Sequence, residues 1–127
     1  MEKKKILVVD DEPDIVILIK SRLESNGYEV IGAYNGKEGI EKAKEFKPDM
    51  ILLDLMMPIM DGYEAGEILR NEEETKDIPI ILFTAASAEE VSQKGTDIIA
   101  AVDYVVKPFD EAALMFLVKR VTEVTEN

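Results

Sequence analysis

The sequence predicts an α/β protein built on a five-stranded parallel sheet with helices on both faces. Short apolar runs recur five times along the chain, segments with helical periodicity alternate with them, and turn residues separate the two. A chain of 127 residues is of single-domain length. We therefore expect one domain over residues 1–127, with its core at about residues 4–124.

The five apolar runs are the expected strands. Each is short and bounded by turn residues, as is typical of strands that are buried on both faces. They occupy residues 6–9, 28–33, 50–53, 78–83 and 103–106.

Five helices are expected after these strands. Pro13 suits the first turn of a helix, where its missing N–H is not needed. Asn35 with Glu38, and Ser87 with Glu90, have the spacing of capping boxes. The helices are expected from 13 to an Asn-Gly stop at 26–27, from 35 to 46, from 62 to about 73, from 87 to about 100, and from Asp110 onward.

Apolar residues at helical spacing indicate the side of each helix that faces the sheet. In the first helix, Val16 and Ile17 widen this side. The expected core positions are Ile15, Leu18, Ile19 and Leu23; Ile40, Ala43 and Phe46; Ala65, Ile68 and Leu69; and Leu114, Leu117, Val118 and Val121.

The composition excludes several classes of function. The chain has no cysteine, so it forms no disulfide or thiolate site, and no histidine, so it has no Ser-His-Asp triad. A net charge of −12 argues against binding to nucleic acids or anionic membranes. No apolar stretch is long enough for a signal peptide or a membrane span, so we expect a cytoplasmic protein.

Polar residues follow four of the expected strands. Asp10, Asp11 and Glu12 follow the first strand, Asp54 the third, Thr84 the fourth and Lys107 the fifth. Each has an ordinary explanation, as a helix cap, a strand end or a surface charge. Because the carboxyl ends of parallel strands share one edge, however, their coincidence predicts a single site.

The charges of this set predict its chemistry. Two carboxylates about 4 Å apart repel by about 4 kcal/mol at an effective dielectric constant near 20, so the acids need a cation. Oxygen ligands favour Mg²⁺, for which Mn²⁺ could substitute, and Lys107 adds a second positive charge. A carboxylate in such surroundings is suited to accept a phosphoryl group, which makes Asp54 the expected nucleophile.

Four motifs occur in a fixed order: VVDDE at 8–12, LLDLMMPIMDG at 52–62, FTA at 83–85 and DYVVKPF at 103–109. Together they resemble the receiver domain of two-component response regulators, of the single-domain chemotaxis-regulator kind, from Lys4 to about Val124. The resemblance implies a flavodoxin-like, doubly wound (βα)5 fold with strand order 2-1-3-4-5. It implies a signalling switch of a phosphorelay rather than a turnover enzyme.

The resemblance also implies roles for the residues of the site. Asp54 is the expected phospho-acceptor. Asp10 and Asp11 match the acidic pair that holds Mg²⁺, together with Asp54 and the backbone carbonyl of Met56. Lys107 matches the lysine that binds the phosphoryl group.

Further matches concern the switch. Thr84 corresponds to the switch hydroxyl and Tyr104 to the aromatic residue whose rotamer follows it. The family implies a cis peptide bond before Pro108 and a change in the face formed by helix 4, strand 5 and helix 5, where a protein target or a second copy would bind. Met115 and Phe116 lie off the main apolar side of the last helix, so we expect them to be partly exposed.

The chain departs from the family pattern at two places. Residues 100–102, Ala-Ala-Val, occupy a turn where the family often has Gly-Ala, and Gly95 lies too early to replace it. Met56 and Ala86 stand at the positions that usually tune loss of the phosphoryl group, and neither side chain can orient water. We therefore expect a long-lived phosphoryl group.

Other functions fit less well. A haloacid-dehalogenase-type phosphatase needs an acid at residue 56, where this chain has Met56. A flavodoxin-like FMN carrier needs a phosphate-binding loop after the first strand, where this chain has acids at 10–14. The Gly36-Lys37 pair lacks the other residues of a P-loop. Since the chain has no histidine, the phosphoryl donor must be a histidine kinase, a phosphotransfer protein or a small phosphodonor. We expect a single-domain regulator, the alternative being a receiver cut from a longer regulator with an effector domain.

Overall fold

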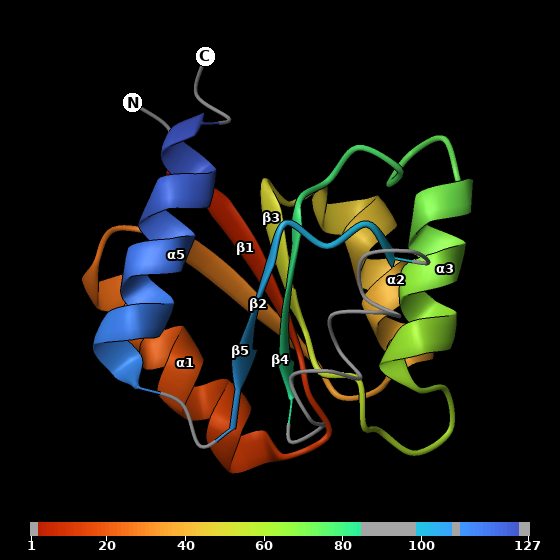
Figure 1. Ribbon diagram of the computed structural model, residues 1–127, viewed down its shortest axis with the longest axis horizontal. Coiled ribbons are helices and arrows are strands. Elements are labelled where there is room, and N and C mark those ends of the chain that lie inside the picture. Colours follow the sequence, from red (N-terminus) through yellow and green to blue (C-terminus); the bar gives the residue numbers. More distant parts are fainter. Residues whose placement is uncertain (1–2, 85–98, 108–109, 125–127) are drawn as a thin grey trace.

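The computed structural model describes residues 3–84, 99–107 and 110–124 (Figure 1). Its centre is a parallel sheet with strand order β2-β1-β3-β4-β5, which confirms the predicted fold. The strands are β1 (Lys5–Val9), β2 (Glu29–Ala33), β3 (Met50–Leu53), β4 (Ile80–Thr84) and β5 (Asp103–Val106). The helices are α1 (Pro13–Ser25), α2 (Gly36–Phe46), α3 (Gly62–Asn71) and α5 (Glu111–Val124). The helix expected at 87–100 lies outside the described residues.

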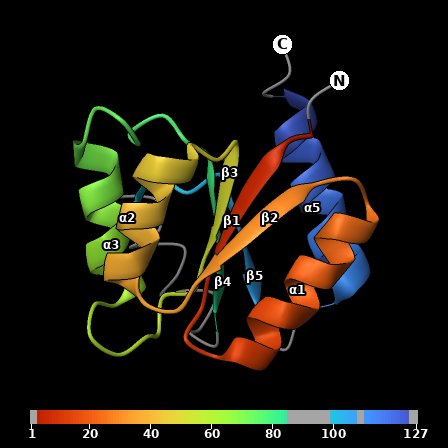
Figure 2. The same ribbon diagram turned by 180° about the vertical axis from the view of Figure 1, so that it is seen from behind.

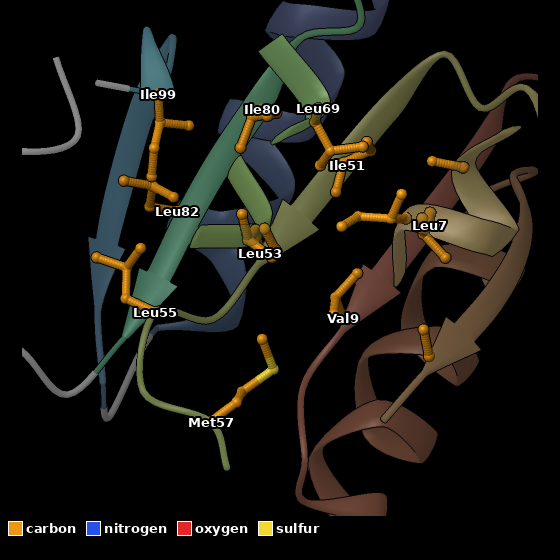
Figure 3. Close-up of a cluster of buried hydrophobic side chains, with 14 residues drawn as sticks. Leu7, Val9, Ile51, Leu53, Leu55, Met57, Leu69, Ile80, Leu82 and Ile99 are labelled. Carbon is orange, nitrogen blue, oxygen red and sulfur yellow. The ribbon is translucent and has the colours of Figure 1, made fainter. Parts of the chain in front are cut away.

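Within the described residues, two helices cover each face of the sheet. Figures 1 and 2 show α1 and α5 on one face and α2 and α3 on the other. Alternate residues of each strand supply two separate cores, because successive strand side chains point to opposite faces. Figure 3 shows the core on the α2 and α3 side, to which β3 contributes Ile51 and Leu53, β4 contributes Ile80 and Leu82, and α3 contributes Leu69.

The inward side of α1 differs from the prediction. Val16, Ile19 and Leu23 are buried, whereas Ile17 is 63% and Leu18 39% exposed. Five consecutive apolar residues at 15–19 hide the helical period in the sequence. The position of the helix on the sheet decides which side packs, so the predictions that Ile17 and Leu18 face inward were wrong.

The other helices agree more closely with the sequence. Ile40 and Ala43 of α2 and Leu114 of α5 are buried, and Phe46 is half-buried. Ala65, Leu69 and Val118 are buried, while Ile68, Leu117 and Val121 are half-buried.

The capping box of α2 forms with one difference. The Asn35 side chain accepts a hydrogen bond from the Glu38 N–H at 2.9 Å, as predicted. The Glu38 carboxylate accepts from the N–H of Tyr34 instead of that of Asn35. This bond still satisfies a backbone donor beside the helix end, so β2 is joined directly to α2.

Arg70 joins the end of α3 to both segments that lead into the neighbouring strands. Its guanidinium donates hydrogen bonds to the carbonyls of Lys76 and Ile78, before β4, and of Ile99 and Ala100, before β5. Burial lowers the pKa of this guanidinium. The four carbonyls replace the water that it loses on burial.

Ala100 has a φ of +55°, in the left-handed region that favours glycine. It begins the Ala-Ala-Val turn where the sequence departs from the family pattern. The departure therefore leaves a strained backbone position directly before β5.

Candidate functional site

The site lies at the edge of the sheet where β1 and β3 end. The N–H of Asp10 donates to the Ala33 carbonyl and the N–H of Asp54 to the Val9 carbonyl, each at 3.0 Å. These bonds extend the strand ladders by one residue. Both aspartates are consequently held on the sheet framework and are almost fully buried, at 0% and 2% exposure.

Lys107, directly after β5, joins the two aspartates. Its Nζ lies 2.8 Å from Asp10 Oδ2 and 3.2 Å from Asp54 Oδ2, and the lysine side chain is only 14% exposed. The more exposed Glu12 carboxylate lies 3.5 Å away. One ammonium therefore compensates two carboxylates at once. Without this compensation, burial would strongly disfavour the charged form of both carboxylates.

The second oxygen of each aspartate binds backbone. Asp10 Oδ1 accepts a hydrogen bond from the Glu12 N–H at 2.9 Å, and Asp54 Oδ1 accepts one from the Met56 N–H at 3.1 Å. Each carboxylate is thus fixed on both sides, so the geometry of the pair depends little on side-chain freedom.

Burial raises the pKa of the Asp54 carboxyl. The Met56 hydrogen bond and the Lys107 charge oppose this shift, and the charge of Asp10 adds to it. Burial works against the charge on Lys107, but its hydrogen bond to Asp10 and the charges of Asp54 and Asp10 outweigh it and raise the pKa of the ammonium. The site therefore keeps a protonated lysine beside a carboxylate that is more basic than an ordinary aspartate.

Three carboxylates form a group that is suited to a metal ion. One oxygen each from Asp10, Asp11 and Glu12 lies within 4.8 Å of the others. Hard oxygen donors with open positions for water fit Mg²⁺ or Mn²⁺. Asp54 adjoins this group through the shared Lys107 ammonium.

The loop from β3 to α3 folds back against the site. The Gly62 N–H donates to the Leu55 carbonyl at 3.0 Å, and a Cβ on Gly62 would lie 2.3 Å from the Asp54 carbonyl oxygen. Only glycine permits this approach. Asp61 caps α3 by accepting a hydrogen bond from the Glu64 N–H, which fixes the far end of the loop.

The structure thus brings together Asp10, Asp54 and Lys107, with Asp11 beside Asp10, as the strand-end argument predicted. The side chain of Met56 is 59% exposed and that of Tyr104 37% exposed. Thr84 ends β4 at the same edge. Ala86 and Pro108, and with Pro108 the expected cis bond, lie outside the described residues, as does the side chain of Thr84.

Sequence reasoning missed one neighbour of the site. Phe83, next to Thr84, is fully buried, and the Lys107 ammonium lies over its ring at 5.1 Å from the centroid. An aromatic residue in an apolar strand is predicted to be an ordinary core residue. The only available signal was its place next to Thr84 at the predicted edge.

Comparison with known proteins identifies the family. The family model of the response regulator receiver domain matches residues 6–119. The chain belongs to this family. Receiver domains are signalling domains of two-component response regulators, and they bind Mg²⁺ in an acidic pocket.

Individual receiver-family proteins agree with this assignment. The chain is 42% identical to the probable transcriptional regulator ycf27 of Porphyridium aerugineum, over 100% of this chain and 53% of that protein. It resembles chemotaxis protein CheY4 of Vibrio cholerae (33% identity, TM-score 0.88, covering 94% and 99% of the two chains). It also resembles TrrA of Thermotoga maritima, solved in complex with Mg²⁺–BeF (40% identity, TM-score 0.82, 93% and 98% covered).

The receiver domain spans about half the length of the first curated relatives it matches. Among the described residues, none of the receiver's helices is long and apolar enough to cross a membrane.

Proposed function

We propose that this receiver domain is a phosphorylation-activated switch in which Asp54 accepts a phosphoryl group. The observation that carries the proposal is the buried Asp10–Lys107–Asp54 arrangement, in which one ammonium lies 2.8 and 3.2 Å from the two carboxylates. Such an arrangement is costly for stability alone, because hydrophobic residues of similar size would often serve as well. A reaction at Asp54 explains why the charges are kept.

Asp54 acts as the nucleophile in this proposal. A carboxylate oxygen bonds to the phosphorus, the bond from phosphorus to the donor breaks, and the donor leaves with the electron pair. Burial raises the pKa of Asp54, so its ionised form is more basic and a better nucleophile. Lys107 is already in place to neutralise a phosphoryl oxygen.

Asp10 and Asp11 would hold Mg²⁺, with Asp54 and the Met56 carbonyl as further ligands. The grouping of the Asp10, Asp11 and Glu12 oxygens within 4.8 Å supports this assignment and adds Glu12 as a nearby carboxylate. When bound, the ion would neutralise charge on the phosphoryl oxygens, and Mn²⁺ could serve in its place.

The output would be a change of surface. In this proposal the Thr84 hydroxyl moves toward the new phosphoryl oxygens and Tyr104 moves inward. This movement changes the face that β5 and α5 would form with the helix expected at 87–100. Tyr104 is 37% and Phe116 64% exposed, so these side chains are available to a protein target or a second copy. Met115 is half-buried and packs against the core on the α1 and α5 side.

The donor would be a histidine kinase or a histidine phosphotransfer protein in the cytoplasm. The absence of histidine from the chain supports an external donor. We propose residues 1–127 as one domain that works by binding partners without turnover chemistry, the alternative being the receiver part of a longer regulator with an effector domain. The half-length match to transcriptional regulators is compatible with that alternative.

Intact mass spectrometry after incubation with acetyl phosphate tests the proposal. Wild-type protein should gain one phosphoryl group with Mg²⁺ and none with a chelator in place of the metal. A gain that does not depend on the metal, or no gain with any phosphodonor, would contradict it.

A further inference from the structure

The two sides of the Lys107 ammonium are unlike. On one side lie the carboxylates of Asp10 and Asp54, and on the other lies the face of Phe83, whose ring centroid is 5.1 Å from Nζ. Within about 6 Å the negative face of an aromatic ring attracts a cation, and it does so most strongly when water is excluded. The lysine is 14% exposed and the phenylalanine is fully buried, so this contact is largely dry.

We propose that Phe83 is a positioning residue for Lys107: its ring face holds the ammonium inward, on Asp54, where it serves the phosphoryl transfer. This inference rests on the proposed function. It adds to it a residue that contacts Lys107 and acts on the reaction only through that lysine.

A third, more exposed carboxylate also lies near the ammonium. Glu12 Oε1 lies 3.5 Å from Nζ, and the Glu12 side chain is 62% exposed. A hydrocarbon side chain in place of Phe83 would offer the cation no attraction on the core side. The ammonium would then shift outward, toward Glu12 and water, and spend less time against Asp54.

The backbone explains why the ring and the lysine meet. In the parallel pairing of β4 with β5, Phe83 lies opposite Val105 and Thr84 opposite Val106. Lys107 is the next residue, so its long side chain runs back over the end of β4. Phe83 points into the core on the α1 and α5 side, where it packs among residues such as Ile81 and Val118.

A fluorinated phenylalanine series separates this role from packing. Fluorine atoms withdraw charge from the ring face while size and apolarity stay nearly constant, so the attraction for a cation falls stepwise. Phenylalanine with one, two and three ring fluorines would be introduced at residue 83 alone by stop-codon suppression. The readouts are the rate of Mg²⁺-dependent phosphorylation by acetyl phosphate, the Mg²⁺ affinity and the melting temperature.

The chain provides a matched control. Lys5 Nζ lies over the ring of Phe46 at 5.3 Å from its centroid, at the opposite edge of the sheet from the site. The same fluorinated residues at 46 weaken an equivalent cation–ring contact that is remote from Asp54. An effect of fluorinating a ring beside a lysine that has nothing to do with the site appears in both series, and the melting temperatures report any difference in packing.

We expect the phosphorylation rate to fall progressively along the series at residue 83, by about threefold or more overall, and to stay constant along the series at residue 46. Phe83→Leu should slow the reaction at least as much. A flat series at 83, or equal falls at 83 and 46, would overturn the inference. If wild-type protein is phosphorylated and the series is flat, only this inference fails; if wild-type protein is never phosphorylated, the proposed function fails.

Discussion

The Lys107 ammonium lies 3.2 Å from Asp54 Oδ2, although 53 positions separate the two residues in the chain. The same ammonium lies 2.8 Å from Asp10 Oδ2, so the strand ends of β1 and β3 and the segment after β5 meet at one charge. We therefore expect stability, metal binding and reactivity to be coupled at this point.

Replacing Lys107 with methionine should destabilise the metal-free protein. The two buried carboxylates would lose their only close cation among the described residues, and breaking a buried pair in this way costs about 3 kcal/mol or more. Mg²⁺ should bind more tightly to the variant, because no ammonium competes for the carboxylates. Urea unfolding and a Mg²⁺ titration measure both effects.

Lys119→Met is the matched control, since Lys119 is exposed on α5 and should tolerate the change. Equal stability of the two variants without metal would show that Lys107 does not compensate the acids.

Replacing Asp54 with asparagine should stabilise the protein at neutral pH. Burial raises the pKa of Asp54, so the folded state binds this proton more tightly than the unfolded state. Ionisation therefore opposes folding, and stability falls as the pH rises from the ordinary aspartate value of 3.8 through the raised pKa. The amide avoids this cost, so we expect the variant to be more stable than the wild type at neutral pH.

The gain should shrink to nothing below the ordinary aspartate pKa, where the carboxyl is protonated in both states. Urea unfolding of both proteins across this pH range is the measurement. A gain that is constant with pH would mean that charge burial is not its cause.

Ala100→Gly should stabilise the protein by about 0.5 to 1 kcal/mol. The φ of +55° at Ala100 strains any residue with a Cβ, and glycine removes this strain at a smaller cost in unfolded-state entropy. Thermal unfolding compares this variant with Ala101→Gly. Ala101 has no left-handed backbone strain that glycine could remove, so the stability of this control should fall. Destabilisation by both substitutions would contradict the prediction.

Met56→Asn should shorten the lifetime of the phosphoryl group, by about threefold or more. Met56 is 59% exposed and follows Asp54 by two residues, so an amide there could orient a water molecule toward the phosphoryl group. The decay of phosphorylated protein, followed by intact mass after removal of the phosphodonor, measures this. Met56→Leu should decay like wild type, and equal rates for the Asn and Leu variants would refute the role of the side chain.

The sequence predicted the part of the site that depends on topology. Because the carboxyl ends of parallel strands share one edge, Asp10, Asp54 and Lys107 must lie at that edge, whatever their side-chain conformations. The core side of α1 was less predictable, because the apolar run at 15–19 satisfies more than one helical face. For this reason the sequence places Ile17 and Leu18 inward, whereas both are exposed.

Contacts that depend on register and rotamer could not be predicted. Phe83 reads as a core residue, and its place under the ammonium follows only from the pairing of β4 with β5. An arginine on α3 would be expected to be a solvated charge, whereas Arg70 donates to four carbonyls of two segments, at 76–78 and 99–100. Its partners are backbone atoms, which carry no sequence signal.

The central claim is that Asp54 is the phospho-acceptor, and the most direct test compares Asp54→Asn with Asp61→Asn. Asp61 lies in the loop after β3 and caps α3, a role that asparagine fills equally well. Asp61→Asn therefore controls for the effect of replacing any aspartate of this loop by asparagine. After incubation with Mg²⁺ and acetyl phosphate, intact mass should show one added phosphoryl group on wild type and Asp61→Asn, and none on Asp54→Asn. A phosphoryl group on Asp54→Asn would contradict the claim.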